Sequence, residues 1–192
     1  MTKRRWWGRW WVIVAVLVLG PAASGAWAGQ VLVPERSEIF FIGKQMGVPA
    51  EGKFQKFAVE AALDPAAVEK STARIVIDMN SVALPAADFT TEVKRKRWFD
   101  AAGFPEATFE SKRFRSLGDG RYEIDGTLTL KGVSREISSP LMLKTDNSEL
   151  VAEGEFEIKR LDFNVGDGPW ADTDTVANEV RIRFKFRLRP QP

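Results

Sequence analysis

Residues 180–189 alternate strictly between apolar and basic side chains. The apolar positions are Val180, Ile182, Phe184, Phe186 and Leu188, and the basic ones are Arg181, Arg183, Lys185, Arg187 and Arg189. Successive side chains of a β-strand point to opposite faces, whereas a helix would spread this pattern around its whole circumference. The segment is therefore predicted to be a strand with one apolar face and one wholly basic face.

The same period of two recurs through most of the chain and predicts eight strands. They cover residues 36–43, 52–63, 72–79, 106–115, 121–130, 133–144, 149–158 and 179–189. Strands four to seven are joined by short links rich in Gly, Asp and Asn, at residues 117–120, 131–132 and 146–148. Links of this length and composition are typical of hairpins, so this half is predicted to be an antiparallel meander.

Eight long strands with one apolar face each need an arrangement that buries those faces. We predict an all-β fold, an eight-stranded antiparallel barrel of the lipocalin-like kind, because closure buries every apolar face and removes the sheet edges. A two-sheet sandwich is the alternative. Between strands three and four, Asp88 is expected to cap a short helix running from Phe89 to Arg97 and lying across one barrel end.

The N-terminal 28 residues have the composition of a secretory signal peptide. Four basic residues precede an unbroken apolar run at residues 10–19, and Ala26-Trp27-Ala28 offers a small-x-small cleavage site. The apolar run is short for a membrane span, which needs ~20 residues. We predict cleavage after Ala28, export to the periplasm and one mature domain at residues 29–192; an uncleaved anchor is the alternative.

Composition narrows the chemistry available to the mature chain. There is no Cys and no His in the sequence, which excludes thiol nucleophiles, a Ser-His-Asp triad and His- or Cys-ligated zinc. Removing residues 1–28 takes away four basic residues and no acid, so the net charge falls from +2 to −2. The basicity that would favour nucleic-acid binding therefore belongs to the signal segment, and we expect no enzyme and no cofactor.

The inward faces of the barrel are the predicted binding surface. The lining candidates are Ile39, Phe41, Ile75, Ile77, Phe109, Leu128, Leu130, Phe156, Ile182, Phe184 and Phe186. Small residues at the same parity are expected to leave free volume among them, at Gly43, Ala73, Gly126, Ala152 and Gly154. Such a cavity would be long and apolar and suited to a hydrocarbon chain. A barrel filled by its own side chains is the alternative.

Three charged features allow further hypotheses. The run at residues 94–97 could attract a phosphate head group or an anionic membrane, although a solvated helix face is favoured. The basic stripe of residues 181–189 is expected on the barrel exterior, paired with Glu153, Glu155 and Glu157. Asp167, Asp172 and Asp174 could ligate calcium, or serve with Asp162 in a carboxylate-based hydrolase, but turn formation is the favoured interpretation.

An ordered set of motifs resembles the YceI-like family of exported polyisoprenoid-binding proteins. An Ile-Asp-x-x-Ser signature occupies residues 77–81, and the most specific stretch is Trp-Phe-Asp-Ala-Ala-Gly-Phe-Pro at residues 98–105. Further matches lie at residues 37–41, 52–57, 63–65, 107–111, 126–133 and 160–166. Many members carry His where this chain has Lys44-Gln45-Met46.

The resemblance implies an eight-stranded barrel whose pore holds an isoprenoid lipid such as a quinone or a polyprenyl phosphate. It implies binding, carriage or storage, without a catalytic step. Separately, we expect no metal site. The resemblance also implies a membrane cytochrome b561-type protein as a candidate partner. A ligand-free structural or stress-related barrel is the alternative function.

Overall fold

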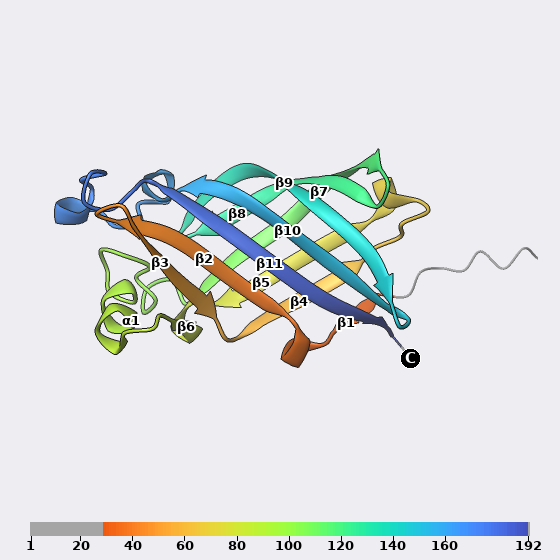
Figure 1. Ribbon diagram of the computed structural model, residues 1–192, viewed down its shortest axis with the longest axis horizontal. Helices are drawn as coiled ribbons and strands as arrows, with labels where there is room; N and C mark the ends of the chain where they lie inside the picture. Colours follow the sequence, from red (N-terminus) through yellow and green to blue (C-terminus); the bar gives the residue numbers. More distant parts are fainter. Residues whose placement is uncertain (1–28, 192) are drawn as a thin grey trace, which may run out of the picture.

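The computed structural model describes residues 29–191, so the predicted signal peptide lies outside the described residues. The chain forms eleven strand segments in this range and one α-helix (Figure 1). The strands are β1 (Gln30–Leu32), β2 (Glu38–Gln45), β3 (Val48–Phe54), β4 (Phe57–Ala62), β5 (Thr72–Asp78), β6 (Val82–Ala83), β7 (Glu106–Gly118), β8 (Arg121–Leu130), β9 (Val133–Asp146), β10 (Glu149–Lys159) and β11 (Glu179–Pro190). The helix is α1 (Ala87–Val93).

These segments make a closed antiparallel barrel of eight strands. Three strands are interrupted, so that β1 with β2, β3 with β4, and β5 with β6 each count as one. From β7 to β11 each strand pairs with the next, and β11 closes the ring by pairing with β2 and with β1. The predicted barrel is confirmed, and closure excludes the sandwich, because a sandwich would leave β1 and β11 apart.

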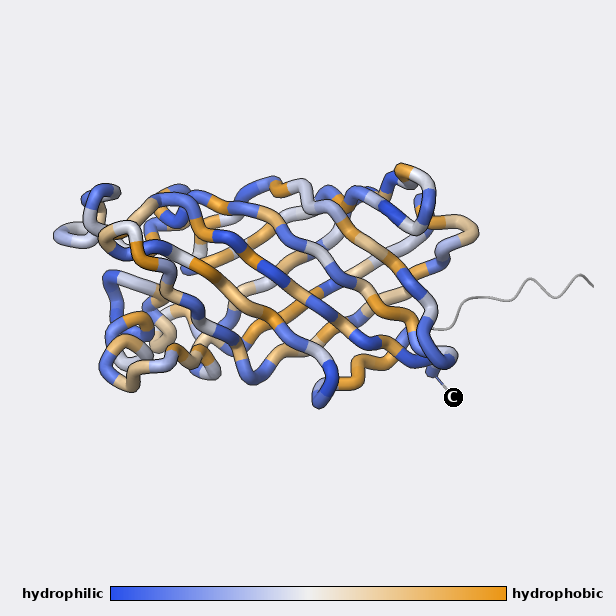
Figure 2. Tube along the Cα trace, in the orientation of Figure 1, coloured by the Kyte–Doolittle hydropathy of each residue, from blue (hydrophilic) through white to orange (hydrophobic). Residues whose placement is uncertain are grey.

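The alternation of side chains sets the two faces of the wall. Figure 2 shows hydrophilic and hydrophobic residues following one another along the strands. On the outer face, β10 and β11 place acid opposite base, with Glu155 3.3 Å from Arg181 and Glu153 3.9 Å from Lys185. The expected pairing of the two charge stripes is therefore confirmed for these residues, and the apolar face of each strand is left for the interior.

The N-terminal part of the barrel is more interrupted than the pattern suggested, and the second predicted strand, residues 52–63, is divided. The turn η1 (Pro34–Arg36) separates β1 from β2, and residues 55–56 separate β3 from β4. Strand β1 was not predicted, since three residues carry too little periodicity, and the two-residue β6 was missed for the same reason. These breaks let long strands bend around the barrel without losing their partners.

The helix prediction was right in place but wrong in its bounds. Helix α1 begins at Ala87 after Ala86, which makes no side-chain cap, so Asp88 lies in the first turn instead of capping it. The hydroxyl of Thr90 holds this start, accepting from the Leu84 N–H at 2.9 Å. The helix ends at Val93, whose carbonyl accepts the Phe99 N–H at 3.0 Å. The chain therefore folds back after residue 93, and residues 94–97 form turns rather than helix.

The barrel has two unlike ends. Helix α1 lies at one end, close to β6, while the described chain begins and finishes at the other (Figure 1). There the Gln191 N–H donates to the Gly29 carbonyl at 3.2 Å. Among residues 29–191, no helix has the length and apolar character needed to cross a bilayer.

Candidate ligand-binding cavity

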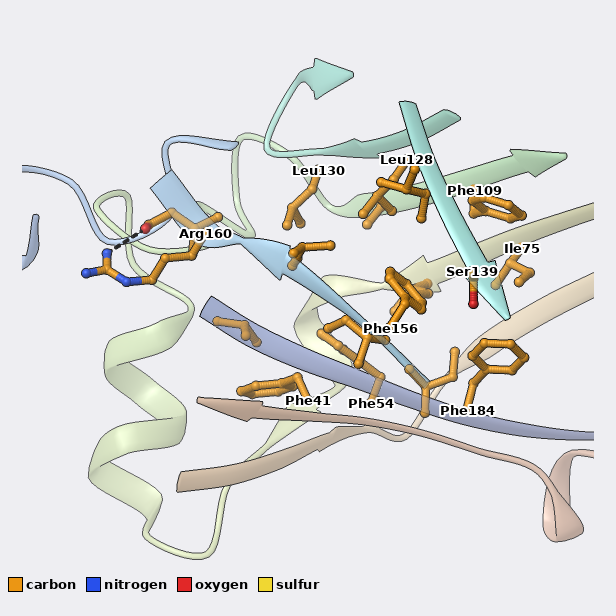
Figure 3. Close-up of a pocket in the computed structure, with 18 of the residues that line it drawn as sticks. Phe41, Phe54, Ile75, Phe109, Leu128, Leu130, Ser139, Phe156, Arg160 and Phe184 are labelled. Atoms are coloured by element: carbon orange, nitrogen blue, oxygen red, sulfur yellow. Dashed lines mark hydrogen bonds between the residues drawn. The ribbon is translucent and has the colours of Figure 1, made fainter. Parts of the chain in front are cut away.

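A cavity of about 270 Å³ lies along the interior of the barrel. All eleven residues predicted to line the interior do so, and most of the remaining lining is also aliphatic or aromatic. Figure 3 shows Phe41, Phe54, Phe156 and Phe184 projecting into the same space from different strands. The structure thus brings the predicted residues together, and their contact with a ligand remains a prediction.

Aromatic rings lie over glycines along the barrel wall. The ring of Phe41 covers Gly52 on the paired strand, that of Phe184 covers Gly154, and that of Phe109 covers Gly126. A Cβ at any of these glycines would lie 2.2 to 2.6 Å from the ring. The expectation that Gly126 and Gly154 leave free volume was therefore wrong, because neighbouring rings occupy the space. Gly43 has no atom within 4 Å of the same position and does border open space.

An aromatic cluster forms the part of the wall nearest α1. The rings of Phe41 and Phe54 are 5.5 Å apart, and each is 6.0 Å from the ring of Phe99. Such separations are those of favourable tilted and edge-to-face pairs. Phe99 is only 8% exposed and belongs to the segment that folds back after α1. The segment between α1 and β7 therefore contributes a side chain directly to the barrel interior.

Polar lining residues concentrate at the α1 end. Gln45, Glu92, Arg160 and Trp170 border the cavity there, and Gln45 and Trp170 are half-buried. Along the bore, Ser139 is the exception, and its hydroxyl is satisfied by the Pro140 carbonyl at 3.0 Å. An apolar cavity with a few convergent polar groups is the usual form of a ligand site. The α1 end is therefore the mouth of the cavity.

The opposite end is closed by buried side chains. Leu63 and Leu188 line the cavity there and are 3% and 1% exposed. The side-chain amide of Gln30 exchanges two hydrogen bonds with the backbone of Leu63, at 2.8 and 3.0 Å. This amide joins β1 to the chain that follows β4. A long ligand would therefore enter from the α1 end and extend toward this one.

Arg160 is buried beneath the loop that covers the mouth. Its side chain is 2% exposed, and five N–H bonds donate to five carbonyls, those of Val165, Gly166, Trp170, Val176 and Ala177. No carboxylate lies within 4 Å of it among residues 29–191. Burial lowers the pKa of Arg160, but the carbonyls stabilise the charged form. All its donors are used, so Arg160 shapes the mouth without donating to a ligand.

Two tryptophans pack against each other beside this arginine, with their rings tilted by 49°. The rings of Trp98 and Trp170 are 5.5 Å apart, and the Arg160 guanidinium lies 5.8 Å from the centre of the Trp98 ring. The buried Trp98 Nε1–H has no hydrogen-bond partner among the described residues. Burying an unpaired donor costs free energy. This indole N–H is therefore a polar group at the mouth that lacks a hydrogen-bond acceptor.

The acidic loop residues take part in local hydrogen bonds and one ion pair. Within residues 29–191, no three acidic side chains come together in a way that could hold a metal ion. Asp167 pairs with Lys131 at 3.2 Å, and Asp172 accepts from Thr175 at 2.7 Å and from the Asp174 N–H at 3.0 Å. Hydrogen bonding to Thr175 lowers the pKa of Asp172. These contacts agree with the favoured interpretation of the residues as turn formers.

Several lining residues escaped the sequence pattern. Phe109 and Phe114 both face inward, although strict alternation would place residues five apart on opposite faces. An irregularity between Ser111 and Arg113 shifts the alternation in β7, and Phe114 is 2% exposed as a result. Trp98 lies outside regular strands, where alternation gives no information. Arg160 resembled an ordinary surface arginine, and only its place at the start of a family motif singled it out.

Comparison with known proteins agrees with this architecture. Residues 31–188 match the family described as the YceI-like domain. The chain belongs to the YceI-like family. A UPF0312 protein of Yersinia pestis is 30% identical over 139 residues, covering 68% of this chain and 69% of that protein.

Solved structures of similar proteins share the barrel. BcnA of Burkholderia cenocepacia superposes with a TM-score of 0.80 at 36% identity, covering 81% of this chain and 98% of BcnA. A structure described as a polyisoprenoid binding domain from Saccharophagus degradans has a TM-score of 0.67 at 18% identity, covering 85% of this chain and 99% of the domain. At that identity the second likeness shows the fold alone.

Proposed function

We propose that this YceI-like protein is an exported carrier that holds one isoprenoid lipid in its barrel, with the tail in the bore and the head group at the α1 end. The observation that carries the proposal is one continuous apolar cavity, closed at one end and bordered by polar groups at the other. A solved relative of the same fold is described as a polyisoprenoid binding domain, which supports this class of ligand.

Burial of a hydrocarbon tail supplies enough free energy for tight binding. Each CH₂ removed from water contributes ~0.8 kcal/mol, so a dozen carbons contribute roughly 10 kcal/mol before ordering costs. The lining offers few polar partners along the bore, and the tail therefore dominates affinity. An isoprenoid quinone and a polyprenyl phosphate are the two head-group classes we propose.

The proposed export and the proposed partner rest on grounds other than the cavity. The basic start, apolar run and Ala26-Trp27-Ala28 site support secretion to the periplasm with cleavage after Ala28. A membrane cytochrome b561-type partner rests on the family resemblance alone. No catalytic step belongs to the proposal.

Native mass spectrometry of protein purified from its host, followed by organic extraction, tests the proposal directly. We expect a stoichiometric adduct that extracts as an isoprenoid quinone or a polyprenol derivative. A clean unliganded mass, with no binding when isoprenoids are added, would contradict it and favour the ligand-free barrel. The intact mass also reports whether residues 1–28 have been removed.

A pair of matched substitutions tests the bore. Phe184→Asp places an unpaired charge among apolar lining residues, and we expect it to abolish lipid uptake. Phe40→Asp is the control, because Phe40 lies on the outer face beneath the Arg183 guanidinium, 4.9 Å away. A folded Phe184→Asp protein that still binds lipid would show that the bore is not the site. Circular dichroism establishes that each variant is folded.

A further inference from the structure

Large exposed hydrophobic side chains are distributed unevenly over the barrel. Among the described residues they are Met46, Val48, Phe89, Phe104 and Leu117. The first two lie at the β2–β3 hairpin, next to Gln45 at the mouth, and Phe89 on α1 borders the mouth itself. Phe104 packs over Gly132 in the β8–β9 turn at the same end. Four of the five therefore surround the cavity opening, and Leu117 lies alone near the end of β7, at the closed end of the barrel.

The four side chains at the mouth come from three separate segments, namely the β2–β3 hairpin, α1 and the turn before β7. Met46 is 78% exposed and Val48 66%, on a hairpin tip where both Met46 and Gly47 adopt positive φ. Phe89, which lies on α1, is 52% exposed. The gathering of these side chains at one end of the barrel gives exposed apolar surface of the kind that marks interaction sites, and a bilayer interior can bury separate apolar side chains without a complementary surface.

Basic side chains accompany the apolar tips. Lys94, Lys96 and Arg97 follow α1, and no carboxylate lies within 4 Å of them among residues 29–191, whereas Arg95 pairs with Glu92 at 2.9 Å. Their charge complements the phosphates of a bilayer surface. Asp172 and Asp174 are exposed on the neighbouring loop, so we expect apolar insertion to contribute more than the anionic character of the lipid.

We propose that the mouth end of the barrel docks on a phospholipid bilayer and takes up its ligand from there. This inference rests on the proposed function, since it supplies the route by which a membrane lipid reaches the cavity. The arrangement of the molecule agrees with it: the described chain begins and finishes at the closed end, so both ends point away from the docked face (Figure 1). Helix α1, the segment between α1 and β7, and the β2–β3 hairpin then surround the cavity opening at the bilayer surface.

Hydrogen exchange in the presence of vesicles locates the docked face. With vesicles of phosphatidylethanolamine and phosphatidylglycerol in a three-to-one ratio, we expect added protection at residues 44–48, 87–97 and 102–105. We expect none at residues 116–121, around Leu117. Protection confined to other segments, or none at all, would overturn the inference. Because the readout is local, it also distinguishes docking by the mouth from any attachment through residues 1–28.

Matched serine substitutions test the consequence for uptake. We expect Met46→Ser combined with Val48→Ser, neither of which lines the cavity, to slow transfer of a fluorescent polyprenol from vesicles about tenfold or more, because two apolar groups that would enter the bilayer are lost. Leu117→Ser removes a similar apolar group from the closed end and should transfer at the original rate. Equal slowing of both proteins, or of neither, would contradict docking by the mouth.

Binding of a water-soluble short-chain prenol separates this inference from the proposed function. The vesicle step is absent there, so all three proteins should bind it with equal affinity. Normal prenol binding without vesicle protection would overturn docking while leaving the carrier function intact. Failure of the unsubstituted protein to bind prenol at all would overturn the carrier function and docking together.

Discussion

At the scale of single residues, the interior of this barrel is set by aromatic rings paired with glycines. Phe41 and Phe184 lie over the glycines directly opposite them on the neighbouring strand, so each ring lies along the wall. A residue with a side chain in place of the glycine would push the ring toward the axis. These pairs therefore keep the bore open even though large aromatic residues line it.

A single methyl group is expected to disturb one of these pairs. In Gly154→Ala the new Cβ would lie 2.4 Å from the Pro140 carbonyl oxygen and 2.6 Å from the Phe184 ring. We expect a loss of about 1–3 kcal/mol of unfolding free energy, as is typical of overpacking. Gly43→Ala is the control, because no atom lies within 4 Å of its Cβ position. Urea unfolding of both variants measures the difference, and equal stability would argue against the pairing.

Arg160 is predicted to be a structural residue of the mouth. Arg160→Met leaves five carbonyls without their donors, and we expect a loss of at least about 3 kcal/mol. Arg160→Lys should also destabilise the protein, since an ammonium group has three donors and cannot reproduce the planar arrangement.

Arg183→Met is the matched control for this prediction. Its guanidinium is exposed and pairs with Glu51 at 3.4 Å, so we expect a change of less than about 1 kcal/mol in urea unfolding. Similar losses at Arg160 and Arg183 would show that burial and the five carbonyls do not matter.

The sequence located most bore residues but not the groups at the mouth. Side-chain alternation identifies inward residues such as Ile182 and Phe156 because strand geometry enforces it. It failed at Phe114, where the irregularity in β7 shifts the parity, and at Trp98, which lies in turns. The glycine positions were identified, but the rings that cover them depend on side-chain rotamers, which periodicity does not encode.

At the scale of elements, the long hairpins from β7 to β11 were predictable and the N-terminal strands less so. The bounds of β8 match the predicted residues 121–130, because both ends are marked by turn residues. The break after η1 and the fold-back after α1 depend on long-range contacts, including the packing of Phe99 inside the barrel. The local sequence pattern carries no information about such long-range contacts.

The charged outer faces of β9, β10 and β11 predict how stability responds to acid. The Lys144 ammonium, 2.6 Å from Glu153, lowers the pKa of that carboxyl below its ordinary value of 4.5. A group whose folded pKa is lowered stabilises the fold above its unfolded pKa, and this contribution is lost as the pH falls through the folded pKa. We therefore expect stability to decrease below about pH 4.5.

Lys144→Met removes the main cause of that shift. The variant should be less stable than the original protein at pH 7, and the difference should shrink as the pH approaches 3. Thermal unfolding measured across this range tests the prediction. A constant difference at all pH values would show that the Lys144 ammonium acts through packing rather than through its charge.

At the scale of the whole molecule, a barrel built around an apolar cavity should be more stable when the cavity is occupied. A ligand at 100 times its Kd adds about 2.7 kcal/mol to the unfolding free energy. For a domain of this size that corresponds to an increase in Tm of roughly 5–10 °C. We expect extraction of the lipid to lower the Tm by this amount and its return to restore it. The Phe184→Asp variant should show no such response.

The paired tryptophans at the mouth have a further consequence for spectroscopy. Residues 29–191 contain two tryptophans, Trp98 and Trp170, and they are the pair whose rings lie 5.5 Å apart. Once residues 1–28 are removed, all indole emission from the molecule originates at this one place. Its intensity, together with the near-ultraviolet circular dichroism of the coupled pair, gives a label-free optical signal at the point where a head group would arrive.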